Sequence, residues 1–276
     1  MICNAHGGVP TCVRNGEIMA DDTSIDLMGG GFTRGMLAEL EQKMVLDAFS
    51  RYVDRVEHRI NDGKEATVYL CCAVRDALDA PFVAAKVYRD RRFRGFANNA
   101  AYTDTSRIRD KRMAKAVRKG TRKGRKVSQR MWVDREWQAL RLLWDAGASV
   151  PEPYDHAPDA VLMEFVGNEA GAAPMLAHVR LSEPEAERAY RMLLEDLALM
   201  LECGLVHGDL SAFNILYHEG RPRIIDLPQA VEVDEAVDGW TLFHRDLVNL
   251  AGYFERQGLN VDPMEDAIAL WGRYVV

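Results

Sequence analysis

The first third of the chain passes from a helical to a strand-like spacing of apolar residues. Apolar positions recur every three or four residues over 36–60, which predicts a helix that ends at the turn-forming sequence "NDG". The runs "ATVYLCCAV" (66–74) and "FVAAKVYR" (82–89) have strand composition, and a short turn-like piece separates them. We therefore expect an antiparallel hairpin after the helix. Residues 1–35 are polar, glycine-rich and aperiodic, and we expect them to be disordered.

The rest of the chain has mainly helical spacing of its apolar residues. Helices are expected over 133–148, 182–204, 241–256 and 263–274. A buried strand is expected at 161–167, and two short strands are expected around "HEGRP". Ser182 followed by Glu185 predicts a capping box at the start of the second of these helices. A β-rich half followed by a helical half indicates an α+β fold with two lobes, 36–163 and 164–276.

The composition is that of an ordinary folded protein. The chain has 276 residues, of which 48% are apolar and 28% are charged, enough for one or two domains with a sizeable core. Because no run of 18 apolar residues occurs and the first residues lack the layout of a signal peptide, we expect a cytoplasmic protein without membrane association. Five cysteines without a C-x-x-C pair indicate reduced thiols.

The net charge of −7 conceals one strongly basic segment. Residues 107–130 contain twelve Lys and Arg and a single acid, Asp110, so this segment carries a net charge of +11. We expect it to lie in a flexible basic loop, 90–130. Its charge is typical of a segment that binds the phosphate backbone of nucleic acid, but it has no aromatic residue for stacking on bases. The alternative is a solvated loop that only maintains solubility.

The stretch "LVHGDLSAFNIL" (205–216) places an acid, Asp209, and an amide, Asn214, in a polar loop between two apolar runs. The hairpin that follows would bring Asp226 back beside Asn214. A carboxylate and an amide carbonyl suit Mg²⁺, which prefers a few protein oxygens together with phosphates and water. Asp209 would then orient or deprotonate an attacking hydroxyl. The loop therefore predicts phosphoryl transfer.

A cation for the phosphates is available on the second strand. Lys86 interrupts the apolar run "VAAKVYR", and a buried Lys requires an anion, for which Glu136 in "DREWQAL" is the candidate. A strand Lys, a helix Glu, H-x-D-x-x-x-x-N and an Asp after a hairpin follow one another in protein kinases, which the chain resembles. Taken singly, each residue has a structural alternative: Lys86 could extend to solvent, Glu136 could be a solvated charge, and Asp209 could be a turn residue.

The sequence also departs from protein kinases. The loop reads "HGD" instead of "HRD", Ser211 stands where protein kinases usually have Lys, and "DLPQAVE" replaces "DFG". No "APE" follows, and the Gly-rich loop is missing from the sequence. Over about residues 58–260, the chain resembles the RIO family of atypical kinases and ATPases. The pieces that carry this resemblance are "GKEATVY", "AAKVYR", "FRGF", "LMEFVG", "HGDLSAFNILYH", "IIDLPQAVE" and "HRDLVNLAGYFERQG".

The resemblance implies a trimmed, bilobal protein-kinase-like fold with a β-rich N-lobe and a mainly helical C-lobe. It implies binding of ATP with Mg²⁺ or Mn²⁺ and activity as a serine protein kinase, with a serine-containing protein substrate, or as an ATPase. Many family members act in maturation of the small ribosomal subunit, so ribosomal RNA or that subunit is the implied partner of segment 107–130. One branch adds an N-terminal winged helix, for which the first fifty residues look too short and too polar.

Carried over by position, the resemblance implies a role for each site residue. Asp209 is the catalytic acid or base. Asn214 and Asp226 hold the metal, and family members can carry a phosphate on the latter. Lys86 contacts the phosphates and Glu136 anchors it. The implied nucleotide contacts are Gly63 and Lys64 in the nucleotide loop, Met163 as gatekeeper, the backbone of Glu164 and Val166, and Ala84 and Leu216 around the base.

Four further residues in these motifs are given supporting roles. His207 is expected to pack and bond the catalytic loop, and Asp246 in "HRDL" is expected to fix that loop from a helix below it. Gln229 and Ser211 are expected either to touch the site or to cap the loop.

Two other functions stay open at this point. Aminoglycoside and choline kinases also use "HGDL" loops without an activation segment, so a small-molecule phosphotransferase is one alternative. That group does not combine "GKEATVY", "DLPQAVE" and a basic loop. The other alternative is an RNA-binding assembly factor for which ATP is only a conformational switch.

Overall fold

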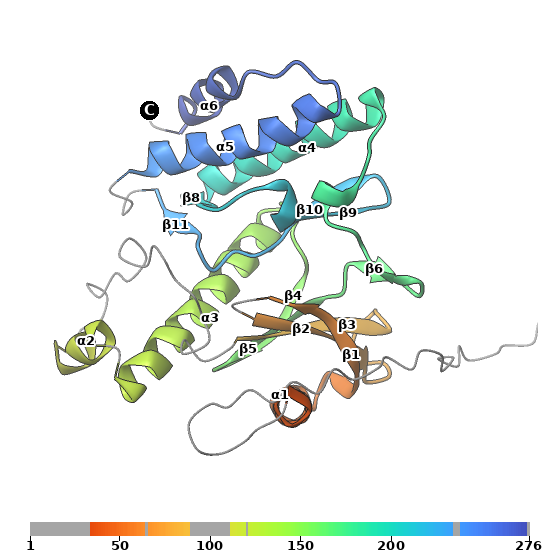
Figure 1. Ribbon diagram of the computed structural model, residues 1–276, viewed down its shortest axis with the longest axis vertical. Coiled ribbons are helices and arrows are strands. Elements are labelled where there is room, and N and C mark those ends of the chain that lie inside the picture. Colours follow the sequence, from red (N-terminus) through yellow and green to blue (C-terminus); the bar gives the residue numbers. More distant parts are fainter. Residues whose placement is uncertain (1–33, 64–65, 89–110, 120, 234–237, 275–276) are drawn as a thin grey trace, which may run out of the picture. The chain divides into compact units, whose positions relative to one another are not determined.

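Figure 1 shows the computed structural model of the chain. It describes residues 34–63, 66–88, 111–119, 121–233 and 238–274. The chain divides into two compact units, Met1–Gln42 and Lys43–Val276. Of the first unit, only the beginning of helix α1 (Arg34–Phe49) is described, so the expected disorder of residues 1–35 falls almost wholly outside the described residues. All later elements belong to the second unit, for which the division into lobes at residue 163 stays a prediction.

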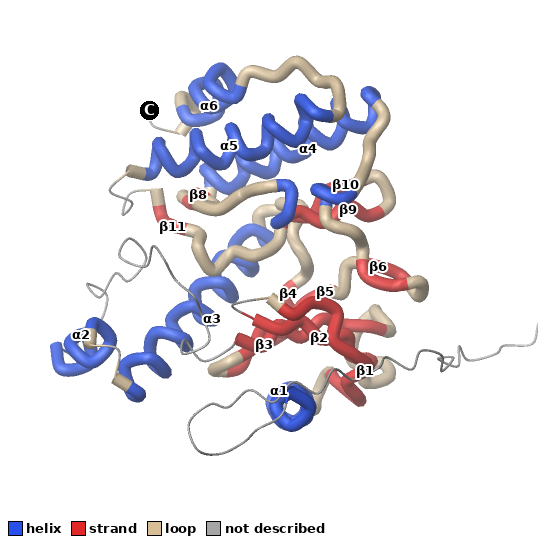
Figure 2. The backbone as a smooth tube through the Cα atoms, in the orientation of Figure 1, coloured by secondary structure: helices blue, strands red, loops and turns tan. Residues whose placement is uncertain are grey.

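A five-stranded antiparallel sheet opens the second unit (Figure 2). Its strands are β1 (Val53–Asp62), β2 (Ala66–Ala73), β3 (Phe82–Tyr88), β4 (Pro153–Ala157) and β5 (Ala160–Glu164), in the order β1-β2-β3-β5-β4. The expected hairpin of β2 and β3 is confirmed. Tyr69 and Leu162 from this sheet form a small apolar core with Val45 and Phe49 at the end of α1.

Residues 53–60, expected to continue the first helix, form strand β1 instead. The pairing of β1 with β2 is irregular three times, after Val53, Val56 and Arg59. Because each bulge adds a residue to the two-residue repeat of a strand, the apolar residues Val53, Val56 and Ile60 recur every three or four positions. The pattern therefore imitates a helix, and the prediction over 36–60 is wrong beyond Phe49.

The basic segment forms a helical hairpin from residue 111 onward, where a flexible loop was expected. The two helices are α2 (Lys111–Arg118) and α3 (Arg122–Asp145). In the connection, the hydroxyl of Thr121 accepts a hydrogen bond of 3.1 Å from the Gly124 amide. A Cβ at Gly124 would lie 2.1 Å from the carbonyl oxygen of Ala116, so the helices approach too closely for any other residue there. Lys, Arg, Ala and Met favour helices, and the high charge obscured this preference.

The helical part of the second unit is organised around one apolar core. Its helices are α4 (Glu183–Glu202), α5 (Gly239–Arg256) and α6 (Pro263–Trp271), close to the expected bounds. Tyr190 of α4 contacts the ring of Phe254 of α5 and donates a 2.6 Å hydrogen bond to Asp266 of α6. As the capping box predicts, the Ser182 amide donates to the Glu185 carboxylate at 2.9 Å. No helix in the described part of the chain is long and apolar enough to cross a membrane.

Short strands and 3₁₀ turns make up the remaining regular elements of the described part of the second unit. They are β6 (Gly167–Asn168), β7 (Gly171–Ala172), β8 (Leu205–Val206), β9 (Ile215–His218), β10 (Arg221–Ile224), β11 (Val231–Glu232) and the 3₁₀ turns η2 (Leu176–His178) and η3 (Ala212–Asn214). Before the loop, β8 pairs with β11, and after it β9 pairs with β10, which confirms the expected hairpin.

Candidate active site

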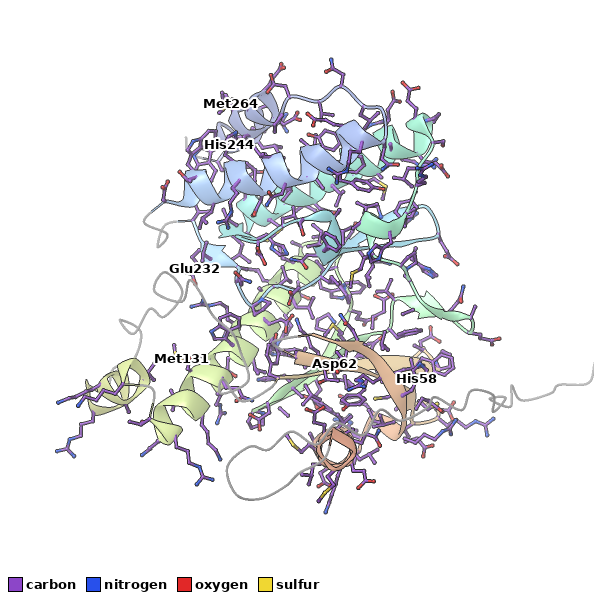
Figure 3. The ribbon with its side chains drawn as sticks, viewed as in Figure 1. His58, Asp62, Met131, Glu232, His244 and Met264 are labelled. Carbon is purple, nitrogen blue, oxygen red and sulfur yellow. The ribbon has the colours of Figure 1, made fainter. Side chains whose placement is uncertain are left out.

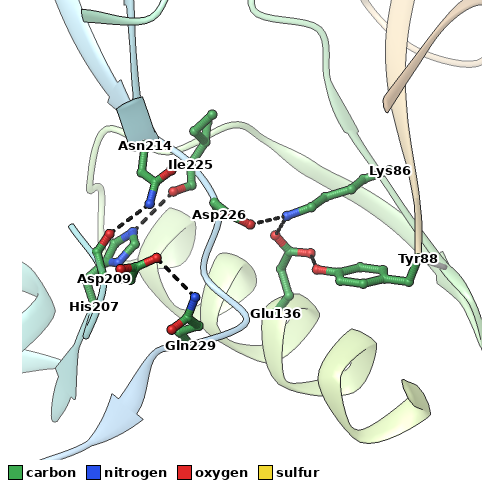
Figure 4. A network of polar contacts seen from close by, with 9 residues as sticks. All are labelled: Lys86, Tyr88, Glu136, His207, Asp209, Asn214, Ile225, Asp226 and Gln229. Atoms are coloured by element: carbon green, nitrogen blue, oxygen red, sulfur yellow. Dashed lines mark hydrogen bonds and ion pairs between the residues drawn. The ribbon is translucent and has the colours of Figure 1, made fainter. Parts of the chain in front are cut away.

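A buried ionic network joins the sheet, α3 and the segment after β10 (Figure 4). The ammonium of Lys86 on β3 lies 2.5 Å from Oε1 of Glu136 on α3 and 2.7 Å from Oδ1 of Asp226. The side chains of Lys86 and Glu136 are only 11% and 4% exposed, whereas Asp226 is 37% exposed. The expected partnership of Lys86 and Glu136 is confirmed, and it satisfies a charge that would otherwise be costly to bury.

Burial and charge act on this network in opposite directions. Burial lowers the pKa of Lys86, but the carboxylates of Asp226 and Glu136 outweigh it and raise the pKa. Burial raises the pKa of Glu136 against the pull of Lys86. Burial also acts to raise the pKa of Asp226, yet Lys86 holds that pKa below its ordinary value. At neutral pH the network therefore contains an ammonium at Lys86 and a carboxylate at Asp226.

Tyr88 belongs to this network and was not predicted from the sequence. Its hydroxyl donates a hydrogen bond to Oε2 of Glu136, so both oxygens of that carboxylate are held. The Lys86 ammonium lies 5.3 Å from the centroid of the Tyr88 ring, within the range of a cation–π contact. Its position two residues after Lys86 could have indicated it, because residues two apart on a strand lie on the same face.

Asp209 and Asn214 lie together in the loop between β8 and β9. The side-chain amide of Asn214 donates a 2.8 Å hydrogen bond to the backbone carbonyl of Asp209. The Ile225 amide donates one of 3.0 Å to the Asn214 carbonyl, which brings the residue before Asp226 against Asn214 as expected. Because Asn214 uses its nitrogen toward Asp209, its Oδ1 is turned away from that contact. This oxygen and the Asp226 carboxylate are donors of the kind that Mg²⁺ and Mn²⁺ bind, so these two residues could hold the ion.

The carboxylate of Asp209 is held by a residue from the segment after β10. Its Oδ2 accepts a 3.0 Å hydrogen bond from the side-chain amide of Gln229. Burial raises the pKa of Asp209, and the negative charge of Asp226 raises it further. His207 and Arg245 act to lower this pKa but do not outweigh burial. A carboxylate with a raised pKa is a better proton acceptor than a solvated one. The expectation that Gln229 touches the site is confirmed.

Side chains of helix α5 hold the loop between β8 and β9 through its backbone. Asp246 is fully buried, and its two oxygens accept hydrogen bonds of 2.7 and 2.9 Å from the Gly208 and Leu210 amides, as expected. Two further α5 side chains bond to the carbonyl oxygens of the same two loop residues: Arg245 to Gly208, and Asn249 to Leu210 at 3.1 Å. The loop is therefore held through its backbone, and the Asp209 side chain stays available for chemistry.

The sheet register places two of the expected nucleotide contacts on the face that carries Lys86. Ala84 lies two residues before Lys86 on β3 and pairs with Met163 on β5. Leu216 is half-buried on β9, directly after the loop residues. The Gly63 amide donates to the Ala66 carbonyl at 3.0 Å, at the turn between β1 and β2. Lys64 lies outside the described residues.

The backbone expected to meet adenine is partly engaged already. The Glu164 amide donates to the Glu152 carbonyl at 2.8 Å. The Val166 carbonyl accepts from the Ala173 amide at 2.9 Å. The Glu164 amide is therefore not free to bind a purine, whereas the Val166 carbonyl oxygen keeps a second lone pair. The roles of Glu164 and Val166 stay predictions.

Comparison with known proteins identifies the family. A family model described as the RIO domain matches residues 67–267. The chain belongs to the RIO family. The serine/threonine-protein kinase RIO1 of Chaetomium thermophilum is 33% identical over 234 residues, 81% of this chain and 43% of that protein. The RIO-type serine/threonine-protein kinase Rio1 of Haloferax volcanii is 34% identical over 220 residues, 80% of this chain and 69% of that protein. The chain therefore spans less than half of the first relative and about two thirds of the second.

Solved structures support the RIO fold. The crystal structure of the Rio2 kinase–ADP/Mg²⁺–phosphoaspartate complex from Chaetomium thermophilum covers 89% of this chain, and the chain covers 70% of it. Its TM-score is 0.60 at 21% sequence identity. A second crystal structure of Rio2 kinase from the same organism has a TM-score of 0.57. The α+β, kinase-like RIO fold expected from the sequence is confirmed.

Proposed function

We propose that this RIO-family chain transfers the γ-phosphoryl group of ATP, as a serine protein kinase or as an ATPase. The observation that carries the proposal is the contact of Lys86 with both Glu136 and Asp226, next to a loop in which Asp209 and Asn214 are bonded to each other. Relatives over four fifths of the chain are named serine/threonine-protein kinases, which supports the same activity.

Each residue receives a role that its chemistry allows. Lys86 is held charged, so it is suited to bind the phosphate oxygens of ATP. Asn214 and Asp226 would hold Mg²⁺ or Mn²⁺, which when bound neutralises charge on the phosphates. Asp209 orients the hydroxyl of a serine or of water and accepts its proton. Glu136 acts through Lys86, whose position it fixes.

The test follows the γ-phosphate of labelled ATP with Mg²⁺ in the wild type, Asp209→Ala and Asp226→Ala. Asp145→Ala is the matched control, because Asp145 is exposed at the end of α3. We expect loss of at least a hundredfold in the rate with both site variants and an unchanged rate with the control. Equal rates in Asp209→Ala and the wild type would overturn the proposal.

The position of the label separates the two activities. Label on a protein serine identifies a kinase, and label released as free phosphate identifies an ATPase. The structural neighbour named above is a phosphoaspartate complex. The corresponding adduct here would form by attack of an Asp226 carboxylate oxygen on the γ-phosphorus with departure of ADP. It would be labile to hydroxylamine and missing in Asp226→Ala.

The two alternatives predict different products. A small-molecule phosphotransferase would move the label to an aminoglycoside- or choline-like acceptor in a screen, and would leave protein unlabelled. A pure switch would turn ATP over slowly and respond strongly to ribosomal subunits. RIO-family membership favours the protein kinase or ATPase over the small-molecule enzyme.

We also propose that the α2–α3 hairpin binds RNA. The proposed partner is ribosomal RNA or the small ribosomal subunit, and the proposed compartment is the cytoplasm. Side chains project outward from both helices (Figure 3). The exposed cations among them are Arg112, Lys115, Lys119, Arg122, Lys123, Lys126 and Arg130. RNA affinity should fall steeply with salt, and Lys123→Glu with Lys126→Glu should reduce that slope by about 1 per lost phosphate contact. No RNA retention at low salt would contradict the proposal.

A further inference from the structure

The contact between Gln229 and Asp209 is held in place from both sides of Gln229. The Ala230 amide donates a 3.0 Å hydrogen bond to the Leu227 carbonyl, which closes a tight turn over 227–230. Leu227 and Ala230 are 1% and 3% exposed, so both ends of the turn are anchored in the apolar core. Gln229 lies between them and directs its amide nitrogen to Oδ2 of Asp209 at 3.0 Å. Its position therefore follows from the packing of the turn.

The same short segment connects the two halves of the candidate site. Asp226 accepts a hydrogen bond of 2.7 Å from the Lys86 ammonium. At the other end, a Cβ on Gly208 would lie 3.0 Å from the Gln229 carbonyl oxygen, so the turn lies directly against the catalytic loop. Gly208 also has a φ of +78°, which favours glycine there. Residues 226–229 thus contact the sheet–α3 network and the catalytic loop at once (Figure 4).

We propose that Gln229 is a positioning residue that orients the Asp209 carboxylate for reaction. The inference rests on the proposed function, because it assigns Asp209 as the proton acceptor. The catalytic loop has Ser211 where protein kinases usually have Lys, and Gln229 supplies a donor from another segment. With Oδ2 held, Oδ1 of Asp209 is the oxygen available to the acceptor hydroxyl. A neutral donor orients the carboxylate and leaves its charge in place.

Kinetics distinguishes orientation from binding and folding. Gln229→Ala removes the donor but no contact of Lys86, so kcat for ATP turnover should fall about tenfold while KM for ATP stays unchanged. Gln229→Glu replaces the donor by a carboxylate that faces Asp209, so kcat should fall further than in Gln229→Ala. Gln229→Lys restores a donor, so kcat should recover in part. The matched control is Gln138→Ala on the exposed face of α3, with wild-type kinetics expected. Wild-type kcat in Gln229→Ala, or equal rates in the Glu and Lys variants, would overturn the inference.

A measurement without turnover tests the contact itself. The side-chain amide signals of Gln229 in a ¹H–¹⁵N spectrum are the pair missing from Gln229→Glu. Asp209→Ala should move this pair, and Asp145→Ala should leave it unmoved. An unmoved pair in Asp209→Ala would refute the inference, whatever the activity. Failure of the wild type to turn ATP over would instead refute the proposed function, so the two failures are distinguishable.

Discussion

At the scale of single residues, Glu136 holds two groups of the site at once. Its carboxylate contacts the Lys86 ammonium and the Tyr88 hydroxyl, and the residue is 3% exposed. Removing one partner of a buried ion pair leaves the other charge poorly compensated. We predict that Glu136→Gln lowers the free energy of unfolding by about 2–3 kcal/mol. This is less than the loss expected when an isolated buried ion pair is broken, because Lys86 keeps its contact with Asp226. Denaturant unfolding measures the change.

A double-mutant cycle shows whether that loss comes from the pair. Lys86→Met removes the ammonium, so Glu136→Gln should cost much less in the Lys86→Met background than in the wild type. The exposed pair Arg130–Asp134, with 3.9 Å between nitrogen and oxygen, is the control. Asp134→Asn should change stability by less than about 0.5 kcal/mol. Strict additivity of the two site substitutions would contradict the prediction.

At the scale of elements, the sequence predicted those whose pattern is set by burial alone. β2, β3, α4 and α5 follow a regular repeat, and they were found within a few residues. β1 was misread as helix because its bulges break the strand repeat. β4 was missed because only part of "PYDHA" is apolar, and its place depends on pairing with β5. Bulges and strand partners are tertiary features that one-dimensional spacing does not contain.

For the candidate site too, some residues were predictable from the sequence and others depended on tertiary packing. The pair of Lys86 and Glu136 was predicted from the sequence, and the structure brings the two into contact. The contact of Lys86 with Asp226 was not predicted. Tyr88 was missed because a Tyr on a buried strand face is equally explained as core. The carboxylate that Gln229 contacts lies twenty residues away in sequence, so no spacing rule fixes their contact. Motifs identified the charged residues of the candidate site, and packing determined which side chains support them.

The α2–α3 hairpin permits a prediction that concerns one whole element pair. Gly124→Ala places a methyl group 2.1 Å from the Ala116 carbonyl oxygen, a backbone atom that only a shift of the helices can move away. We predict that this substitution separates α2 from α3, seen as faster amide hydrogen exchange over 111–119. Because no cation is removed, weaker RNA retention by the variant would show that RNA binding depends on how the two helices arrange their basic side chains. Unchanged exchange would contradict the close packing.

At the scale of the whole molecule, buried carboxyl groups make stability depend on pH. Asp196 on α4 is 3% exposed, and its Oδ1 accepts a 2.8 Å hydrogen bond from the Ser149 amide between α3 and β4. Within the described part of the chain, its Oδ2 has no hydrogen-bond partner. Burial raises the pKa of Asp196 to about 6, against the Ser149 bond. Asp196 therefore connects α4 to the segment between α3 and β4, but its charged form is less stable in the folded chain than in the unfolded chain.

The direction of the pH effect follows from proton binding. The unfolded chain releases the Asp196 proton near pH 4, whereas the folded chain keeps it to about pH 6, so the folded state binds more protons between these values. The contribution to the unfolding free energy is thus fully present below pH 4 and declines by about 3 kcal/mol as pH rises through 6. We predict that Asp196→Asn lacks this decline. Urea unfolding of both proteins from pH 4.5 to 7.5 measures it, with Asp145→Asn as the exposed control. Parallel stability curves for Asp196→Asn and the wild type would show that Asp196 titrates as an ordinary aspartate, and that its burial does not govern its charge.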